Sequence, residues 1–149
     1  MAIPTSAEEL QTYMNKFLDR LGFEDIVSTL GLRAHQADGQ SISLRMDLKE
    51  SLAQANGMYS AAALFGAADI AGTFLAMAAY AGSGQFPLAV QSNQNFMTNS
   101  KSEYAVATAK ILRGGGSVAV AEVTVADDSG KALMHSTFTY VLKERKLGK

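Results

Sequence analysis

The 149-residue chain contains no cysteine and only two prolines. Without cysteine, the chain cannot form a disulfide, a cysteine nucleophile or a cysteine-ligated zinc site of its own. This composition fits a reducing compartment. Residues 1–10 also lack a basic stretch followed by an apolar core, so we expect no secretory signal and a cytoplasmic protein.

Charge is also scarce and balanced. Thirteen Lys and Arg stand against fourteen Asp and Glu, for a formal net charge of −1. A chain without a basic field has little to attract nucleic acid or an anionic membrane, so we expect neither as a partner. Between Glu50 and Lys101 the only charged side chain is Asp69, which lies in an Ala-rich stretch at 59–81.

Several catalytic motifs are missing. The chain has no G-x-S-x-G nucleophile elbow, no Walker loop and no H-E-x-x-H. Serine hydrolases of the elbow type, P-loop enzymes and zinc proteases of this motif are therefore excluded as serious alternatives. We expect no metal site, and we interpret Asp127 and Asp128 as turn residues.

The apolar positions of residues 6–21 have helical spacing, with a capping-box pattern of Ser6 and Glu9 and a stop at Gly22. A second short helix is expected at 24–30. The stretch 59–81 predicts one long apolar helix. Its length permits a transmembrane interpretation, which we reject because it is rich in Ala and Gly, carries Asp69 near its middle and lacks flanking basic residues.

The remaining segments predict strands. Residues 41–48 alternate strictly between apolar and polar side chains and are expected to pair with 32–37 across a turn at Asp38 and Gly39. Four more strands are expected at 87–98, 102–113, 117–127 and 131–143. The sequence therefore predicts one α+β domain over 1–149, in which an antiparallel sheet wraps a helix made thin by alanine. Residues 1–30 form its N-terminal helical segment and 144–149 a frayed tail.

Residues 64–71 read LFGAADIA, which resembles the LF-x-LAD-x-A signature of hotdog-fold acyl-CoA thioesterases, and in particular the phenylacetate-pathway thioesterases. The run at 93–142 also resembles the later strands of that family, with turns after LRGG and at DDSGK. The resemblance covers about residues 30–143. It implies a hotdog fold and hydrolysis of an acyl-CoA thioester, with coenzyme A as part of the substrate and no separate cofactor.

The resemblance also implies a set of site residues. Asp69 matches the acid, Thr73 a hydroxyl residue one turn later, Gln54 an amide residue and Ala61 the oxyanion donor. Residues expected to contact the substrate are Gly57, Ser60, Ala62, Arg113, Gly114, Gly115 and Ser117. The family usually has His-Gly-Gly where this chain has Ser60, Ala61 and Ala62.

Asp69 lies two to three helical turns from Ala61, too far for both to reach one acyl carbon from the same helix. The family solves this by dimerisation, in which one subunit supplies the helix N-terminus and the other the acid. We therefore expect a homodimer, or a tetramer built as a dimer of dimers, joined through the strand at 87–98.

Each assignment has a simpler alternative. Asp69 could be a structural carboxylate, Gln54 a turn-capping amide, Thr73 a helix hydroxyl that bonds a preceding carbonyl, and the glycines at 114–116 only a hairpin turn. His35 and His135 are expected to be ordinary strand residues. A non-catalytic acyl-thioester binder is the main functional alternative, which the missing His-Gly-Gly favours. A dehydratase is a third, although it usually needs a histidine beside the acid.

Overall fold

The computed structural model describes residues 2–82 and 84–144. In chain order, α1 (Ala7–Leu18) and α2 (Ile26–Leu30) precede the hairpin of β1 (Arg33–Ala37) and β2 (Ser41–Asp47). A short 3₁₀ turn, η1 (Glu50–Leu52), leads to α3 (Ala61–Tyr80). Four long strands follow: β3 (Gln85–Phe96), β4 (Tyr104–Gly114), β5 (Val118–Asp127) and β6 (Ala132–Glu144).

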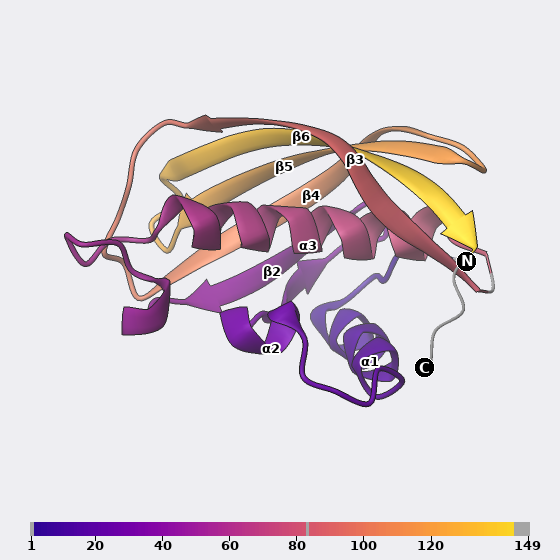
Figure 1. Cartoon of the computed structure of the whole chain (residues 1–149), viewed down its shortest axis with the longest axis horizontal. Helices are drawn as coiled ribbons and strands as arrows, with labels where there is room; N and C mark the ends of the chain where they lie inside the picture. Colours follow the sequence, from indigo (N-terminus) through magenta and orange to yellow (C-terminus); the bar gives the residue numbers. More distant parts are fainter. Residues whose placement is uncertain (1, 83, 145–149) are drawn as a thin grey trace.

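The six strands form one antiparallel sheet in the order β1-β2-β4-β5-β6-β3. The sheet curves around α3, while α1 and α2 lie on the other side of that helix (Figure 1). This arrangement confirms the predicted hotdog architecture. It also leaves β3 and β1 as the two edge strands.

Small side chains let the helix and sheet approach closely. On α3, Ala63, Ala67, Ala68 and Ala71 are buried. The strands present more small residues to the same core, namely Ala105, Ala107, Ala109, Ala119 and Ala121, all at most 1% exposed. Bulkier side chains on either surface would force the layers apart, because protein interiors are already close-packed.

Local signals mark the ends of the first two helices, and the start of α1 is as predicted. Ser6 caps α1 by accepting from the N–H of Glu9 at 3.2 Å, and Gly31 ends α2 with a φ of 65°. The capping box differs in one detail, because the Glu9 carboxylate accepts from the Thr5 N–H and hydroxyl instead of the Ser6 N–H. Helix α1 also ends at Leu18, and Gly22 lies in the following turn.

The boundaries of the other elements shift by a few residues from those predicted. The long helix begins at Ala61, because Ser60 is its N-cap. Strand β6 includes Glu144, which was assigned to the tail, and 145–149 lie outside the described residues. Helix α3 is long and apolar enough to span a membrane, but 61% of that window is buried inside the fold. Enclosure by the sheet explains its apolar composition.

Candidate active site along the central helix

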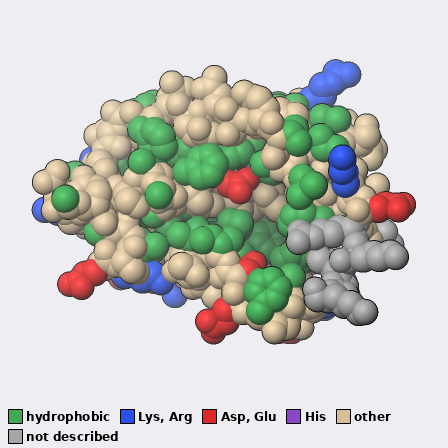
Figure 2. Space-filling view, in the orientation of Figure 1, with side chains coloured by type: hydrophobic (Ala, Val, Ile, Leu, Met, Phe, Trp, Pro, Cys, Tyr) green, Lys and Arg blue, Asp and Glu red, His purple; other side chains and the backbone are tan. Residues whose placement is uncertain are grey.

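One stripe of α3 remains partly open, while the face of the helix that packs on the sheet is buried. Ala61, Phe65, Asp69 and Thr73 lie four residues apart on this stripe, and none of them belongs to the buried core. Residues at this spacing share one helix face. Figure 2 shows a band of hydrophobic side chains across this face, with an acidic side chain in its middle. The structure thus brings Ala61, Asp69 and Thr73 onto one surface.

Asp69 is half-buried and its carboxyl group has one hydrogen-bonding neighbour on the sheet. The Tyr140 hydroxyl lies 3.4 Å from Asp69 Oδ1 and donates to the Asp69 backbone oxygen at 3.0 Å. Burial raises the pKa of Asp69, and the Tyr140 hydrogen bond partly opposes that rise. An acid with a raised pKa on an open stripe has the properties of a general base or nucleophile.

The beginning of α3 offers free backbone donors. The Ser60 hydroxyl accepts from the Ala63 N–H at 3.1 Å, so this side chain serves as the helix cap. Within residues 2–82 and 84–144, no group accepts from the N–H of Ala61 or Ala62, and both residues are exposed. Unpaired N–H groups at a helix N-terminus favour a developing negative charge.

The loop before α3 holds Gln54 and Gly57 in a tight turn. The Gln54 N–H donates to Met58 O, and the Gly57 N–H donates to Gln54 O, both at 2.8 Å. The Gln54 side-chain oxygen accepts from the Asn56 N–H, so it is engaged within the turn. Gly57 has a φ of 76°, which a residue with a side chain rarely adopts.

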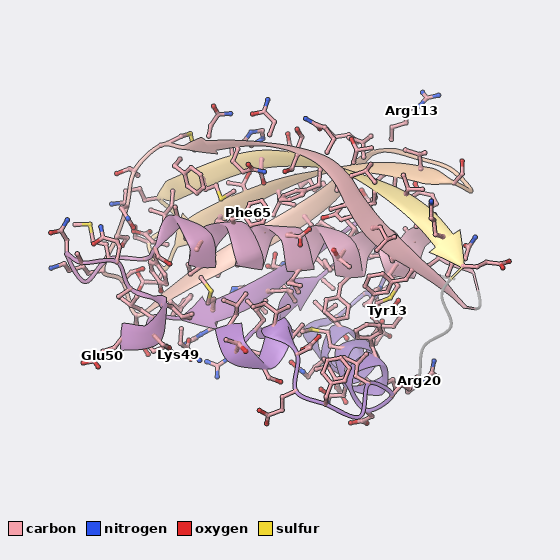
Figure 3. All side chains as sticks on the ribbon, viewed as in Figure 1. Tyr13, Arg20, Lys49, Glu50, Phe65 and Arg113 are labelled. Carbon is pink, nitrogen blue, oxygen red and sulfur yellow. The ribbon has the colours of Figure 1, made fainter. Side chains whose placement is uncertain are left out.

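The predicted coenzyme A contacts lie at the other end of the helix. Gly114 packs under the ring of Tyr80, the last residue of α3, and the Gly115 N–H donates to Val118 O at 3.0 Å within the hairpin. Arg113 is exposed. Figure 3 shows Arg113 at the end of the molecule opposite Lys49 and Glu50, which precede α3. One chain therefore does not bring this hairpin together with Ala61.

An apolar pocket of about 160 Å³ lies beside the open stripe. Thr73 and Ile70 of α3 form one wall, and Phe17, Phe23 and Ile26 of the N-terminal segment contribute to the others. Phe23 and Ile26 are 69% and 49% exposed. A larger groove, of about 750 Å³, runs among residues 2–16 along α1 and includes none of the predicted site residues.

The other polar residues of interest lie elsewhere. His135 contacts Glu122 at 3.1 Å between β6 and β5, while His35 is exposed on β1. The Asp127 carboxylate accepts from the N–H groups of Ser129 and Lys131, each at 3.0 Å, as a turn residue does. In the described part of the chain, no three His, Cys, Asp or Glu residues are placed to hold a metal ion.

Sequence reasoning missed two residues next to Asp69. Tyr140 belongs to the alternating pattern of β6, and that pattern indicates only a side chain in the apolar core. Gly72 lies among many small residues of α3, so composition alone gives it no special role. A glycine in the middle of a buried helix was nevertheless a usable signal, because it destabilises a helix by about 1 kcal/mol relative to alanine unless close packing requires it.

A family model described as the thioesterase superfamily matches residues 56–134, which include the whole of α3 and most of the sheet. This chain belongs to the thioesterase superfamily. No curated protein sequence is significantly similar to it. The finer assignment to the phenylacetate-pathway group stays a prediction.

Solved structures of several thioesterases have the same fold as this superfamily member. A thioesterase from Haemophilus influenzae is 18% identical, with 87% of this chain and 90% of that chain covered and a TM-score of 0.78. A mutant thioesterase from Pseudomonas aeruginosa is also 18% identical, with coverages of 93% and 94% and a TM-score of 0.79. A thioesterase family protein from Silicibacter pomeroyi is 22% identical, with coverages of 89% and 98% and a TM-score of 0.78.

Proposed function

We propose that this protein hydrolyses an acyl-CoA thioester to a carboxylic acid and free coenzyme A, at a site shared between two subunits. The observation that carries the proposal is Asp69, the one charged side chain of α3, placed on the same open stripe as the free N–H groups at the helix start. Membership of the thioesterase superfamily supports thioester hydrolysis as the reaction.

In this reaction Asp69 of one subunit activates a water molecule or attacks the acyl carbon itself. The carbonyl oxygen gains negative charge and accepts from the Ala61 N–H of the other subunit, with Ala62 beside it. Collapse of the tetrahedral intermediate breaks the carbon–sulfur bond, and the thiolate of coenzyme A leaves. It takes up the proton that Asp69 removed from the water or, if Asp69 attacked the carbon itself, a proton from solvent. If Asp69 has attacked, water then hydrolyses the resulting anhydride. Gln54 and Thr73 assist in orienting water and carbonyl.

The need for a second subunit follows from the geometry of one helix. Ala61 and Asp69 are eight residues apart, which corresponds to about 12 Å of rise along α3. A reacting carbon must lie about 3 Å from each group. An antiparallel partner helix would bring its own N-terminus to Asp69. The unpaired edge of β3, with Leu88 and Val90 exposed at 41% and 60%, supports pairing of the two sheets there.

The pocket between α3 and the N-terminal segment supports a compact acyl group. A cavity of about 150 Å³ with aliphatic and aromatic walls accommodates benzene, and the volume here is about 160 Å³. Thr73 lines this pocket one turn from Asp69, so a single ring or a short branched chain would extend from the reacting carbon into it. The exposed apolar side chains of Phe23 and Ile26 would then gain a partner.

The coenzyme A moiety needs cationic and polar groups. Arg113 is available because its side chain is exposed, while the Gly115 N–H is already paired within the hairpin. Gly114, Gly115 and Ser117 therefore contribute mainly by shaping the turn that presents Arg113. The antiparallel partner would carry this hairpin toward the helix N-terminus of the first subunit.

A non-catalytic acyl-thioester binder is the alternative function. The substitution of His-Gly-Gly by Ser60, Ala61 and Ala62 favours it, because the alanine methyl groups narrow the approach to the free N–H groups. Both functions use the open stripe of α3 and the apolar pocket beside it, and they differ only in whether the bound thioester is hydrolysed.

Release of free coenzyme A from a panel of acyl-CoA esters tests the proposal. We expect wild-type turnover, and a loss of at least about 100-fold in kcat for Asp69→Asn with the oligomer intact, since a positioned acid–base group contributes at least that much. Asp19→Asn, on the exposed end of α1, is the matched control and should keep the wild-type rate. Coenzyme A binding without release by the wild-type protein would instead establish the binder.

A further inference from the structure

Tyr140 is a fully buried side chain of β6 whose hydroxyl lies directly beneath Asp69. It is 0% exposed, and its ring stacks on that of Phe138 with centroids 5.9 Å apart. The hydroxyl donates to the Asp69 backbone oxygen at 3.0 Å and lies 3.4 Å from the carboxylate Oδ1. A tyrosine buried this deeply needs a polar partner, and its hydroxyl makes two hydrogen bonds to the predicted catalytic acid, one to the backbone oxygen and one to the carboxylate.

Gly72 makes this approach possible. A Cβ at position 72 would collide with the Tyr140 hydroxyl and come within 3.2 Å of two ring carbons. Gly72 is itself buried in the middle of α3, where glycine destabilises a helix by about 1 kcal/mol relative to alanine. A phenylalanine at position 140 would fill the same core volume without the hydroxyl. Core packing therefore accounts for the ring but not for the oxygen that it directs at Asp69.

We propose that Tyr140 is a positioning residue for Asp69: its hydroxyl fixes the carboxyl group on the open stripe and stabilises the ionised form. The role rests on the proposed function of Asp69 as the acid. Tyr140 does not touch the substrate, because it is covered by α3. Thr73 lies one turn after Asp69 on the same stripe, and its side chain acts to lower the pKa of Tyr140 against the rise caused by burial and Asp69.

The protonation states agree with this role. Burial and the neighbouring Asp69 both raise the pKa of Tyr140, so its hydroxyl remains a donor throughout the working pH range. Burial raises the pKa of Asp69, and the hydrogen bond from Tyr140 lowers it. Among the described groups around the stripe, Asp25 lines the neighbouring pocket, whereas His135 and Glu122 pair with each other on the outer face of the sheet.

The test is Tyr140→Phe, which removes one oxygen and keeps the ring. We expect kcat to fall about 10-fold while KM changes less than about two-fold, since the loss affects the acid and not substrate contact. The acidic limb of the kcat profile should move to higher pH, because a carboxylate that loses a hydrogen-bond donor has a higher pKa.

Tyr59→Phe is the matched control. Tyr59 is also 0% exposed, but its hydroxyl donates to the backbone oxygens of Met46 and Ser102, away from Asp69. Loss of this hydroxyl should lower the melting temperature as Tyr140→Phe does and leave the pH profile in place. A purely structural Tyr140 would make the two variants alike, and that result would overturn the proposal.

A titration that needs no substrate separates this inference from the proposed function. The carboxyl carbon of Asp69 can be followed by carbon-13 NMR in protein labelled at aspartate, with Asp69→Asn to assign the signal. A higher pKa in Tyr140→Phe than in wild type supports the positioning role even if the wild type hydrolyses no thioester. An unchanged pKa would refute it, whatever the activity.

Discussion

Asp69 occupies a position where two physical influences on its pKa oppose each other. The carboxyl group loses water because the helix packs into the sheet, and it gains a hydrogen bond from Tyr140. The first influence is the larger, so the folded protein binds the proton of Asp69 more tightly than the unfolded chain does. The charged form of this residue therefore destabilises the fold.

This imbalance predicts a stability change in Asp69→Asn that depends on pH. The pKa of an aspartate in the unfolded chain is about 3.9, and the pKa of Asp69 in the folded protein is higher. The free energy of unfolding therefore falls as the pH rises from about 3.9 through the pKa of the folded protein. The asparagine variant should therefore have the higher melting temperature at pH 7, and the difference should vanish below about pH 4. Circular dichroism melts from pH 3.5 to pH 8 measure it. A variant less stable than wild type at pH 7 would contradict the assigned balance.

Residue types alone could identify Asp69, because it is the one charge within a long apolar stretch. They could not identify Tyr140, which lies 71 residues away and meets Asp69 only when β6 packs under α3. The roles assigned to Gln54 and Ser60 stay predictions. The structure adds that the oxygen of each side chain already accepts a local backbone N–H.

At the level of elements, α1 and α2 do more than cover the apolar underside of α3. Phe17 of α1 packs edge-on against Phe74 with centroids 5.6 Å apart, and Leu30 of α2 lies over Gly66. Together with α3, the linker between α1 and α2 and Phe86 of β3, these helices line the apolar pocket beside Thr73. The family-model match begins at residue 56, so this wall of the pocket comes from a part of the chain outside the match.

The apolar pocket should limit the size of the acyl group that the protein accepts, and Ile26 helps to set this limit. Ile26→Ala removes apolar surface at the rim, so kcat/KM for acyl groups of eight or more carbons should rise severalfold relative to a single-ring or short-chain ester. Ser28→Ala, at an exposed position of the same helix, is the control and should leave the ratio unchanged. Chain-length profiles of coenzyme A release provide the measurement. Equal profiles for wild type and Ile26→Ala would place the acyl group elsewhere.

Helix starts and hairpin turns were predictable because their signals are local. Ser6, the predicted cap of α1, accepts from an N–H three residues on, and Gly39, with a φ of 83°, lies in the predicted turn between β1 and β2. Ser60 caps α3 by the same kind of local contact, although we expected it to contact the substrate and the helix to begin at residue 59. The Glu9 contact was less predictable. The N–H and hydroxyl of Thr5 and the N–H of Ser6 are all close enough in sequence to donate to the Glu9 carboxylate. The sequence alone does not show which of these donors the Glu9 carboxylate binds.

In the whole molecule, the two edge strands of the sheet differ in how much other elements cover them. Helix α1 packs against β1, whereas β3 pairs only with β6 in the described structure and exposes several apolar side chains. These are Leu88, Val90 and Phe96. An uncovered apolar edge strand is prone to pair with another copy, which agrees with the proposed dimer.

The proposed dimer predicts that Val90→Lys produces monomers. In a two-fold interface, each subunit contributes one new lysine, and the two lysines face each other or the apolar side chains of the partner strand. The affinity of the subunits for each other should therefore fall by at least about 10-fold. Gln36→Lys, exposed on the opposite edge strand β1, is the control and should leave the dimer unchanged. Light scattering coupled to size exclusion measures the mass. A monomeric wild type that still turns over substrate would refute the shared site.

The sequence by itself determined the kinds of element, their order and the lone acid in the apolar helix. Those features depend on periodicity, capping residues and composition within short windows. Only the tertiary structure decided what lies around that acid: the hydroxyl of Tyr140, for which Gly72 leaves room, and the nearby pocket beside Thr73. Gly72 lies three residues from Asp69 on the same helix, but Tyr140 and the N-terminal wall of the pocket come from distant parts of the chain. Only the packing of the sheet and helices around α3 brings these distant groups near the carboxylate.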